Sequence, residues 1–272
     1  MVSFSQEITG KVINAKNGKP LEFVSIGVIS KPVGTITNEK GHFKLNTKNI
    51  SIKSSVRFSM IGYKAQTFKI KELKKFNNII ILEEETIQLS EVIVKPTGKL
   101  REVGITDSPF LAEVCGWGGT EFGQGHEIGS EIDLGVWPVK LIYLQILLHK
   151  QSFDSTLLRL HIRSIVDSLP DKELLSENII FSVSQESGWI DVDLSQYNIV
   201  LNDKIALSLE WIKIYGVNED RFVILNENKH STPVVVFKIK RETGSMFTRW
   251  GSEATWQRTE NKNPAFYLTV QE

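Results

Sequence analysis

Short strand-like segments, separated by turn residues at a spacing of roughly ten residues, fill the first third of the chain and constrain its fold most strongly. Residues 55–60 alternate apolar and polar side chains with the period of two that a half-buried strand shows. Asn17-Gly18 and Lys40-Gly41 lie between such segments, and glycine supplies the positive φ of tight hairpin turns. Six or seven short strands at this spacing predict a β-sandwich over residues 7–95.

Two features indicate where the core of this sandwich lies. The continuous apolar run over 78–82 is typical of a buried strand. The alternating segments add further inward-facing positions. We therefore expect a first-domain core that contains Phe43, Val56, Phe58, Ile80 and Leu82.

Several motifs in the same region resemble the carboxypeptidase regulatory-like domain. In chain order they are Ile8-x-Gly10-x-Val12, Gly18-x-Pro20-Leu21, Val24-x-Ile26, Gly34-Thr35-x-Thr37-Asn38-x-x-Gly41-x-Phe43 and Ile61-Gly62-Tyr63. The resemblance implies a transthyretin-like sandwich with no peptidase chemistry of its own. In Bacteroidetes this domain often precedes outer-membrane TonB-dependent receptors and other exported proteins, and residues 87–94 resemble the tail that follows it there. The remaining sequence is too short for a receptor barrel, so we do not expect a complete TonB-dependent transporter.

Residues 1–6 are apolar and small, and they end just before the first predicted strand. They resemble the end of a secretory signal peptide, so we expect an exported protein of the periplasm or cell surface; the alternative is a frayed terminus. No apolar run approaches the roughly 20 residues of a membrane-spanning helix. Pro96 and Gly98 fall in a stretch without apolar periodicity, which predicts a linker over 96–101.

Residues 102–272 predict a second domain of eight or more antiparallel strands. The strand-like segments are 139–148, 157–166, 178–183, 188–194, 203–214, 232–240 and 265–270. This rhythm favours a jelly-roll β-sandwich, so the expected fold class is all-β throughout. The stretch Trp189 to Tyr197 resembles jelly-roll domains of Bacteroidetes surface and carbohydrate-binding proteins. The glycines from Gly116 to Gly129 instead predict an irregular loop.

Charge is unevenly distributed between the two halves. Residues 1–96 hold 15 Lys/Arg against 8 Asp/Glu, and residues 97–272 hold 17 against 24. The lysines of the first half are scattered and have no aromatic platform between them, so we expect no nucleic-acid partner. We interpret the opposite charges as favouring docking of the two domains. The single cysteine, Cys115, excludes an internal disulfide.

The motifs of common catalytic sites are missing from the sequence. It has no phosphate-binding loop, no Gly-x-Ser-x-Gly elbow and no compact histidine pair. Asp191 and Asp193 share one strand face, and we expect both to face solvent. We therefore expect no enzyme. The alternative is a carbohydrate-active or peptidase-related enzyme with its active site in the C-terminal domain, which a cleft with convergent acids or histidines would favour.

All six tryptophans lie in the second half of the chain. We expect Trp211, within an apolar strand, to be buried. Sugars stack on flat aromatic rings, and loops on a rigid sandwich often carry function. The aromatic and basic residues of the glycine-rich and polar loops are therefore the candidate ligand-binding residues: Trp117, Phe122, Arg249, Trp250 and Trp256.

We expect no organic cofactor, but an acidic stretch keeps a structural calcium ion open as an alternative. Oxygen ligands suit calcium, and the candidates are Glu121, Glu127, Glu131 and Asp133. Taken together, the sequence predicts a non-catalytic cell-envelope protein. We expect it to act in ligand binding, with a glycan as the candidate ligand, or in protein assembly.

Overall fold

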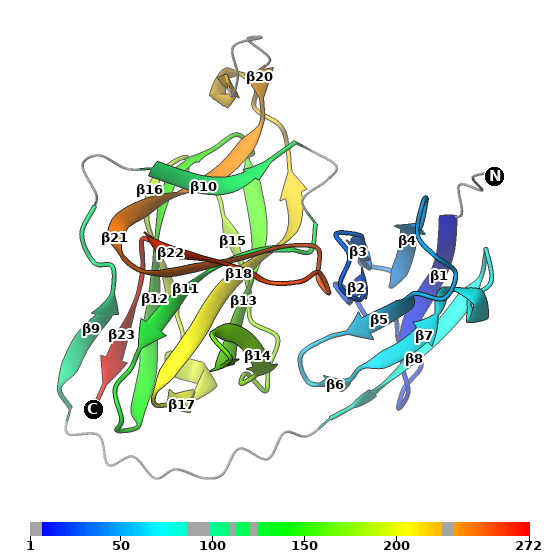
Figure 1. Ribbon diagram of the computed structural model, residues 1–272, viewed down its shortest axis with the longest axis horizontal. Coiled ribbons are helices and arrows are strands. Elements are labelled where there is room, and N and C mark those ends of the chain that lie inside the picture. Colours follow the sequence, from blue (N-terminus) through cyan, green and yellow to red (C-terminus); the bar gives the residue numbers. More distant parts are fainter. Residues whose placement is uncertain (1–6, 86–97, 109–112, 120–123, 225–230) are drawn as a thin grey trace.

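The structure is a computed structural model that describes residues 7–85, 98–108, 113–119, 124–224 and 231–272. Figure 1 shows two bodies of strands, a smaller one formed by the first part of the chain and a larger one formed by the rest. Within the described residues the only helices are three 3-10 turns, η1 (Ile70–Glu72), η2 (Ser195–Tyr197) and η3 (Glu219–Arg221). The prediction of an all-β fold is confirmed.

The N-terminal domain is a sandwich of two four-stranded sheets, ordered β4-β1-β8-β6 and β3-β2-β5-β7. Strands β1 and β8 are parallel, and the other pairs are antiparallel. The strands are β1 (Glu7–Asn14), β2 (Ser25–Val28), β3 (Gly34–Ile36), β4 (His42–Asn46), β5 (Ser55–Ser59), β6 (Tyr63–Lys64), β7 (Gln66–Lys69) and β8 (Asn78–Glu84).

The predicted core of this domain is confirmed. Its five members are at most 4% exposed: Phe43, Val56, Phe58, Ile80 and Leu82. Phe43 and Phe58 pack edge to face, with ring centroids 5.3 Å apart, and join the two sheets. The alternation of apolar and polar residues in β4 and β5 therefore decides which side chains face inward.

The apolar run over 78–82 does not form a fully buried strand, so that prediction was wrong. In β8 only alternate residues point into the core, and Ile79 and Ile81 are 67% and 50% exposed. The physical reason is that this sheet packs on one side only, so one face of β8 meets solvent whatever its side chains.

The C-terminal domain contains the remaining strands. They are β9 (Leu100–Gly104), β10 (Glu113–Gly118), β11 (His126–Asp133), β12 (Val139–Gln151), β13 (Ser155–Val166), β14 (Leu169–Glu173), β15 (Ile180–Val183), β16 (Gly188–Asp193), β17 (Val200–Leu201), β18 (Lys204–Tyr215), β19 (Val223–Ile224), β20 (Ser231–Thr232), β21 (Val234–Trp250), β22 (Gln257–Pro264) and β23 (Phe266–Gln271). All but the β19–β20 pair belong to one hydrogen-bonded path, β14-β13-β18-β11-β21-β12-β23-β9, with β10, β15, β16, β17 and β22 attached.

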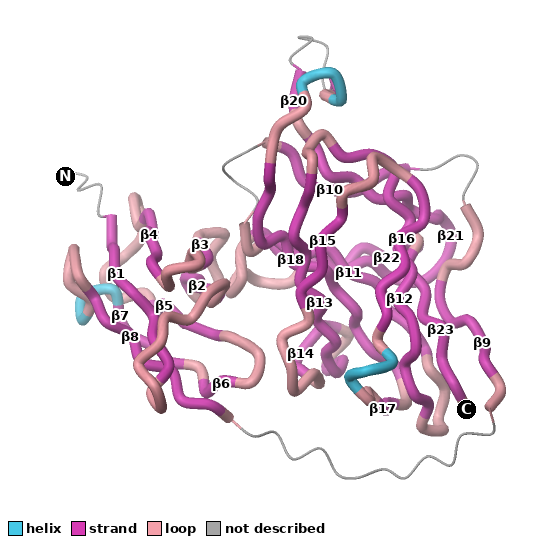
Figure 2. The backbone as a smooth tube through the Cα atoms, turned by 180° about the vertical axis from the view of Figure 1, so that it is seen from behind, coloured by secondary structure: helices cyan, strands magenta, loops and turns pink. Residues whose placement is uncertain are grey.

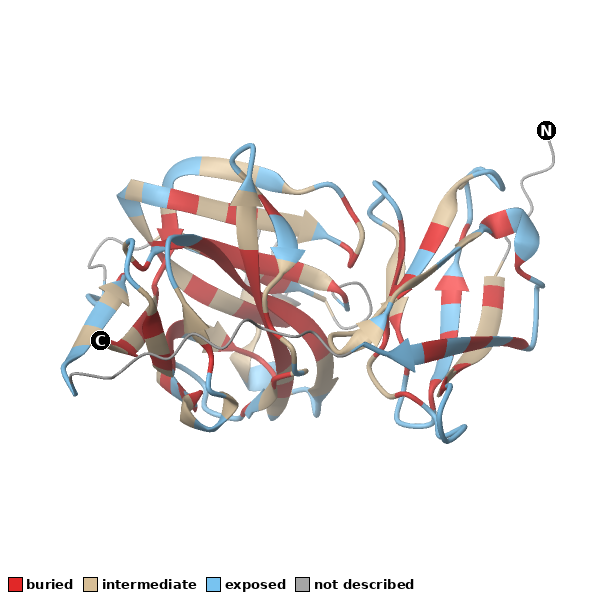
Figure 3. Ribbon diagram, turned by 90° about the horizontal axis from the view of Figure 1, so that it is seen from below, coloured by how far each residue is buried: buried red, intermediate tan, exposed pale blue. Residues whose placement is uncertain are grey.

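This path folds into a jelly-roll-like sandwich because β21 is shared by both layers. One end of β21 pairs with β11 and β22, and the other end pairs with β10 and β12. Strands β13, β18 and β11 lie toward the N-terminal domain, whereas β12, β23 and β9 lie on the far side (Figures 1 and 2). Figure 3 shows buried segments concentrated where the layers face each other. Trp211 is buried there, as expected.

Two features of the second domain differ from the sequence prediction. The glycine-rich stretch is not one irregular loop, because Gly116 lies in β10 and Gly129 in β11. A Cβ at Gly116 would lie 2.1 Å from the Val235 carbonyl oxygen, so close strand approach explains the glycine. The predicted linker also ends early: Leu100 and Arg101 already pair with β23, and Pro96 lies outside the described residues.

Substitution of Phe43 by alanine should lower the free energy of unfolding of the N-terminal domain by about 3–5 kcal/mol, because it removes a ring that joins both sheets. Native-state hydrogen exchange of the β4 and β5 amides measures this domain separately. Phe76→Ala, at a side chain 53% exposed, is the control and should change the same quantity by less than about 0.5 kcal/mol. A loss below about 1 kcal/mol for Phe43→Ala would contradict the assigned core.

Candidate functional site at the domain interface

Four neighbouring strands of the second domain carry one row of charged side chains. Arg159 on β13 lies opposite Glu210 on β18, Glu210 lies opposite Glu127 on β11, and Glu127 lies opposite Arg249 on β21. Directly opposite residues in antiparallel strands point to the same side of a sheet. The register therefore places two carboxylates side by side with an arginine at each end, on the face turned toward the N-terminal domain.

The carboxylates of this row are fully buried and bonded to arginines. Arg159 Nη1 lies 2.8 Å from Glu210 Oε2, and both side chains are 1% exposed. Glu127 accepts from Arg249 Nε at 2.9 Å and from Arg163 Nη1 at 2.6 Å. Two like charges opposite each other would destabilise the sheet. The three guanidinium groups remove that cost.

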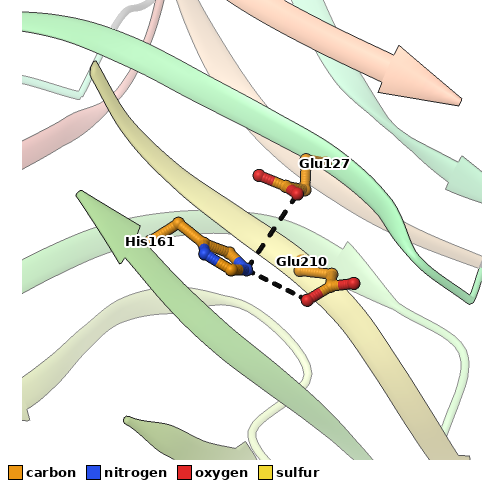
Figure 4. Close-up of side chains that lie close together, drawn as sticks. All are labelled: Glu127, His161 and Glu210. Atoms are coloured by element: carbon orange, nitrogen blue, oxygen red, sulfur yellow. Dashed lines mark hydrogen bonds and ion pairs between the residues drawn. The ribbon is translucent and has the colours of Figure 1, made fainter. Parts of the chain in front are cut away.

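His161 lies at the centre of the same face. Its Nε2 is 3.0 Å from Glu210 Oε2 and 4.0 Å from Glu127 Oε1, as Figure 4 shows. Its Nδ1 is 2.6 Å from Glu173 Oε2 on the neighbouring β14. Both ring nitrogens thus face carboxylate oxygens.

The pKa values of Glu127, Glu210 and His161 are all shifted in the direction that favours the charged form. Burial opposes ionisation of Glu210, but Arg159 and His161 outweigh it and lower the pKa of Glu210 to about 2. Burial likewise opposes ionisation of Glu127, yet Arg163, Arg249 and His161 hold its pKa well below the ordinary value. Burial and Arg163 disfavour the protonated form of His161, but Glu127 and Glu173 raise its pKa.

Glu127, His161 and Glu210 place ligand atoms within 4.8 Å of one another, which is compact enough for a metal ion. The donor set does not fit one. Arg163 and Arg249 already bond Glu127, and Arg159 bonds Glu210. A divalent cation would have to displace these fixed charges and deprotonate His161. The cluster is therefore a salt-bridge network.

The N-terminal domain docks directly onto this network. Ser25 on β2 donates to Glu210 Oε1 and accepts from Arg159 Nη1, both at 2.8 Å. Arg159 Nη2 also donates to the carbonyl oxygen of Phe23. One serine of the first domain thus bridges both members of a buried ion pair in the second.

A second contact forms where Glu253, in the loop between β21 and β22, meets the first domain. Glu253 accepts from Ser59 Oγ at 3.1 Å, and its carbonyl oxygen accepts from the Ser30 amide at 2.8 Å. A Cβ at Gly27 would lie only 2.7 Å from the Glu253 amide nitrogen, so glycine permits this close approach. At the interface rim, Lys213 pairs with Glu39 at 2.6 Å.

A cavity of about 530 Å³ remains between the domains beside these contacts. The N-terminal domain contributes Arg57, Met60 and Tyr63 to its wall, and the second domain contributes residues of the network and Trp256. The Trp256 ring lies beneath two guanidinium groups, 4.6 Å from Arg249 and 5.4 Å from Arg163. The wall therefore combines hydrogen-bond donors, acceptors and the aromatic rings of Tyr63 and Trp256.

The structure separates the candidate ligand residues of the sequence analysis. Arg249 and Trp256 line the cavity. Trp250 is 41% exposed and packs edge to face on His126, outside the cavity wall. Trp117 is 2% exposed and packs in the core 5.6 Å from Trp211, so it offers no open ring face to a ligand, and its prediction was wrong. Phe122 lies outside the described residues.

The candidate calcium ligands do not come together in the described part of the chain. Glu127, Glu131 and Asp133 lie along a single strand, β11, which rises about 3.3 Å per residue and spreads them apart. Glu131 pairs with Lys204 at 3.1 Å and Arg258 at 3.2 Å, and Asp133 is exposed. Glu121 lies outside the described residues.

Sequence reasoning missed most of the network. The sequence analysis named Glu127 and Arg249 as candidates, but it identified neither Arg159 nor Glu210 and gave His161 no role. A signal was present: Arg159, His161 and Arg163 interrupt an apolar strand at every second position. That spacing puts all three side chains on one face, opposite the core.

Comparison with known families supports the architecture of the first domain. Residues 8–94 match the family model of the CarboxypepD_reg-like domain, which confirms the resemblance seen in the sequence. A comparison with curated proteins finds no match.

The solved structures that are similar to this chain include three that align at low TM-scores. The cysteine protease and lectin-like domains of Cwp84, a surface layer associated protein of Clostridium difficile, align with TM-score 0.38 and 9% identity over 98% of this chain, which spans 59% of that chain. A putative carbohydrate binding protein from Bacteroides uniformis aligns with TM-score 0.25 and 12% identity over 98% of both chains. A DUF3823 family protein from Parabacteroides merdae aligns with TM-score 0.21 and 12% identity, over 77% of this chain and 100% of that one. Similarity at this level assigns neither fold nor function.

Replacing Arg159 by methionine should destabilise the second domain by about 3–5 kcal/mol, because Glu210 would be left buried without its partner. Arg159→Met combined with Glu210→Gln should cost less than the single change. Urea unfolding followed by tryptophan fluorescence measures this domain, since all tryptophans lie in it. Equal or larger losses in the double variant would show that the two side chains are not coupled.

The network also predicts an acid limit to stability. Folding lowers the pKa of Glu210 from 4.5 to about 2, so the native state binds fewer protons than the unfolded state between these values. The contribution of Glu210 to the free energy of unfolding is therefore fully present above pH 4.5 and is lost as the pH falls toward 2. Glu210→Gln should flatten the decline in unfolding free energy over this range. An unchanged slope would contradict the assignment.

Proposed function

We propose that this protein is a non-catalytic binding protein of the cell envelope that holds its ligand in the cavity between its two domains. The observation that carries the proposal is the composition of the cavity wall. Both domains contribute side chains, and Arg249 and Trp256, which the sequence already favoured as ligand residues, lie in it together. The CarboxypepD_reg-like domain supports an exported location, because such domains often occur in envelope proteins.

The wall suits a polyhydroxylated ligand such as a glycan. Hydroxyl groups both donate and accept, and the wall offers guanidinium donors beside carboxylate acceptors. Arg57 is 46% exposed and its contact to Glu253 is long, at 3.6 Å, so it retains hydrogen-bonding capacity for a ligand. The ring of Trp256 is half-buried, and the part of it that the guanidinium groups of Arg163 and Arg249 leave exposed adds an apolar surface for a sugar.

The chemistry of the reactive groups argues against catalysis. A general acid must carry a proton near neutral pH, yet arginines hold Glu127 and Glu210 ionised. The pKa of His161 is raised by Glu127 and Glu173, but its two nitrogens are bonded to the carboxylates of Glu173 and Glu210, so neither nitrogen is directed at a ligand in the cavity. Burial raises the pKa of the Cys115 thiol to about 12, so little reactive thiolate forms at neutral pH.

Binding to a panel of neutral and acidic oligosaccharides, measured by isothermal titration calorimetry, tests the proposal. Trp256→Ala should weaken the binding of a ligand from this panel about threefold to tenfold, because one stacking surface is lost. Trp256→Phe should retain most of the affinity. Trp137→Ala, at a ring 79% exposed and not part of the cavity wall, is the matched control and should bind normally. Equal affinity of the wild type and Trp256→Ala would place the site elsewhere.

Undocking the domains provides a second test. Gly27→Val keeps a residue type that strands favour but adds side-chain atoms against Glu253. We expect small-angle scattering to show a longer particle and calorimetry to show loss of binding, while circular dichroism remains that of a β protein. Full affinity in an undocked variant would show that the cavity is not the binding site.

A further inference from the structure

A second set of aromatic and polar side chains lies on the far side of the molecule from the cavity. Residues of β16, β12, β23 and β9 are direct cross-strand partners there, for example Tyr143 with Asp193 and Gln145 with Tyr267. Their sequence neighbours Leu144, Ile146 and Leu268 point into the core, so this set points outward. We call it the far face, with members Glu102, Tyr143, Gln145, Trp189, Asp191, Asp193, Tyr267 and Thr269.

The aromatic rings of the far face are held in place but not covered. Trp189 and Tyr267 pack edge to face with ring centroids 5.1 Å apart. Trp189 also packs against a small apolar cluster that includes Ile105 and Leu147. Tyr143 is 38% exposed. Pre-positioned tyrosine and tryptophan rings on a flat sheet are typical of protein interaction surfaces, because they offer large contact areas at a low cost in side-chain entropy.

The charge of the far face is negative on both rims. Glu102 lies on β9, and Asp191 and Asp193 lie on β16, three strand spacings or about 14 Å away. No member is a lysine or arginine, and no ion pair joins Glu102 or Asp191 to any described residue. Burial, Glu102 and Asp191 together raise the pKa of Tyr267, as expected when both carboxylates act on its phenol.

We propose that the far face binds an extended, lysine- or arginine-bearing segment of a partner protein. A basic side chain can lie over an exposed ring and pair with a rim carboxylate, which joins a cation–π contact to a charge-assisted hydrogen bond. Charge complementarity favours this occupant over a neutral glycan, which leaves the carboxylates without counter-charges. Strands β12, β23 and β9 lie on the side of the second domain away from the N-terminal domain (Figures 1 and 2), whereas the cavity lies between the domains, so the inference stands independently of the proposed function.

Titration of the full-length protein with an oligolysine peptide, followed by calorimetry and tryptophan fluorescence, tests the proposal. The double variant Glu102→Gln/Asp191→Asn removes two exposed charges without changing side-chain size, and we expect it to weaken binding about tenfold. Tyr143→Ala should weaken binding about threefold through loss of one ring. Glu177→Gln, an exposed acid outside the far face, is the control for general electrostatic attraction and should retain full affinity.

Three results would overturn the proposal. Equal peptide affinity in the wild type and the double variant would show that the attraction is not local. A neutral oligosaccharide that binds the far face more tightly than the peptide would assign it to a glycan. Self-association of the wild type in analytical ultracentrifugation, abolished by the double variant, would assign it to a second copy of the chain.

Discussion

The pair of buried carboxylates, Glu127 and Glu210, determines which side chains must surround it at the interface between the two domains. Opposite each other on adjacent strands, they would repel strongly unless cations surrounded them. Arg159, Arg163 and Arg249 supply those cations, and the cavity and the docking contacts lie around the resulting network. A buried ion network contributes little stability compared with an apolar core of equal volume. The docked orientation gives Arg159 and Glu210 additional hydrogen bonds to Ser25 and Phe23, so the network favours this arrangement of the domains.

Glycine and serine in the first domain complete that orientation. Ser25 fits between Arg159 and Glu210, and Gly27 two residues later allows Glu253 to approach the same strand. Both residues lie on β2, so a single short strand carries both parts of the contact. At the rim of the interface, Lys213 of the second domain pairs with Glu39 of the first. This pair has the reverse polarity of the net charges of the two halves, so individual contacts rather than net charge define the interface.

The sequence predicted the first domain well because its signals are local. Alternation identified Phe43 and Phe58 as core residues, and the order of turn motifs indicated the family. For the second domain the sequence predicted the fold class but not the pairing of the strands. The network brings together residues from 127 to 249, and strand register, which no local pattern encodes, decides that Arg159 meets Glu210. Trp117 was misplaced because glycines usually mark loops, whereas here they let strands approach closely.

The placement of β21 has a consequence for how the chain acquires its fold. This strand begins at Val234 and pairs with β10, β11, β12 and β22. Neither layer of the second sandwich can be completed until this segment near the end of the chain has been synthesised. Contacts between residues so distant in sequence form slowly, because a long loop must close first. The first domain has all its described strands by Glu84 and can fold during synthesis. The docking surface of the first domain is therefore folded before the second domain is complete. The second domain then folds slowly in the presence of an already folded neighbour.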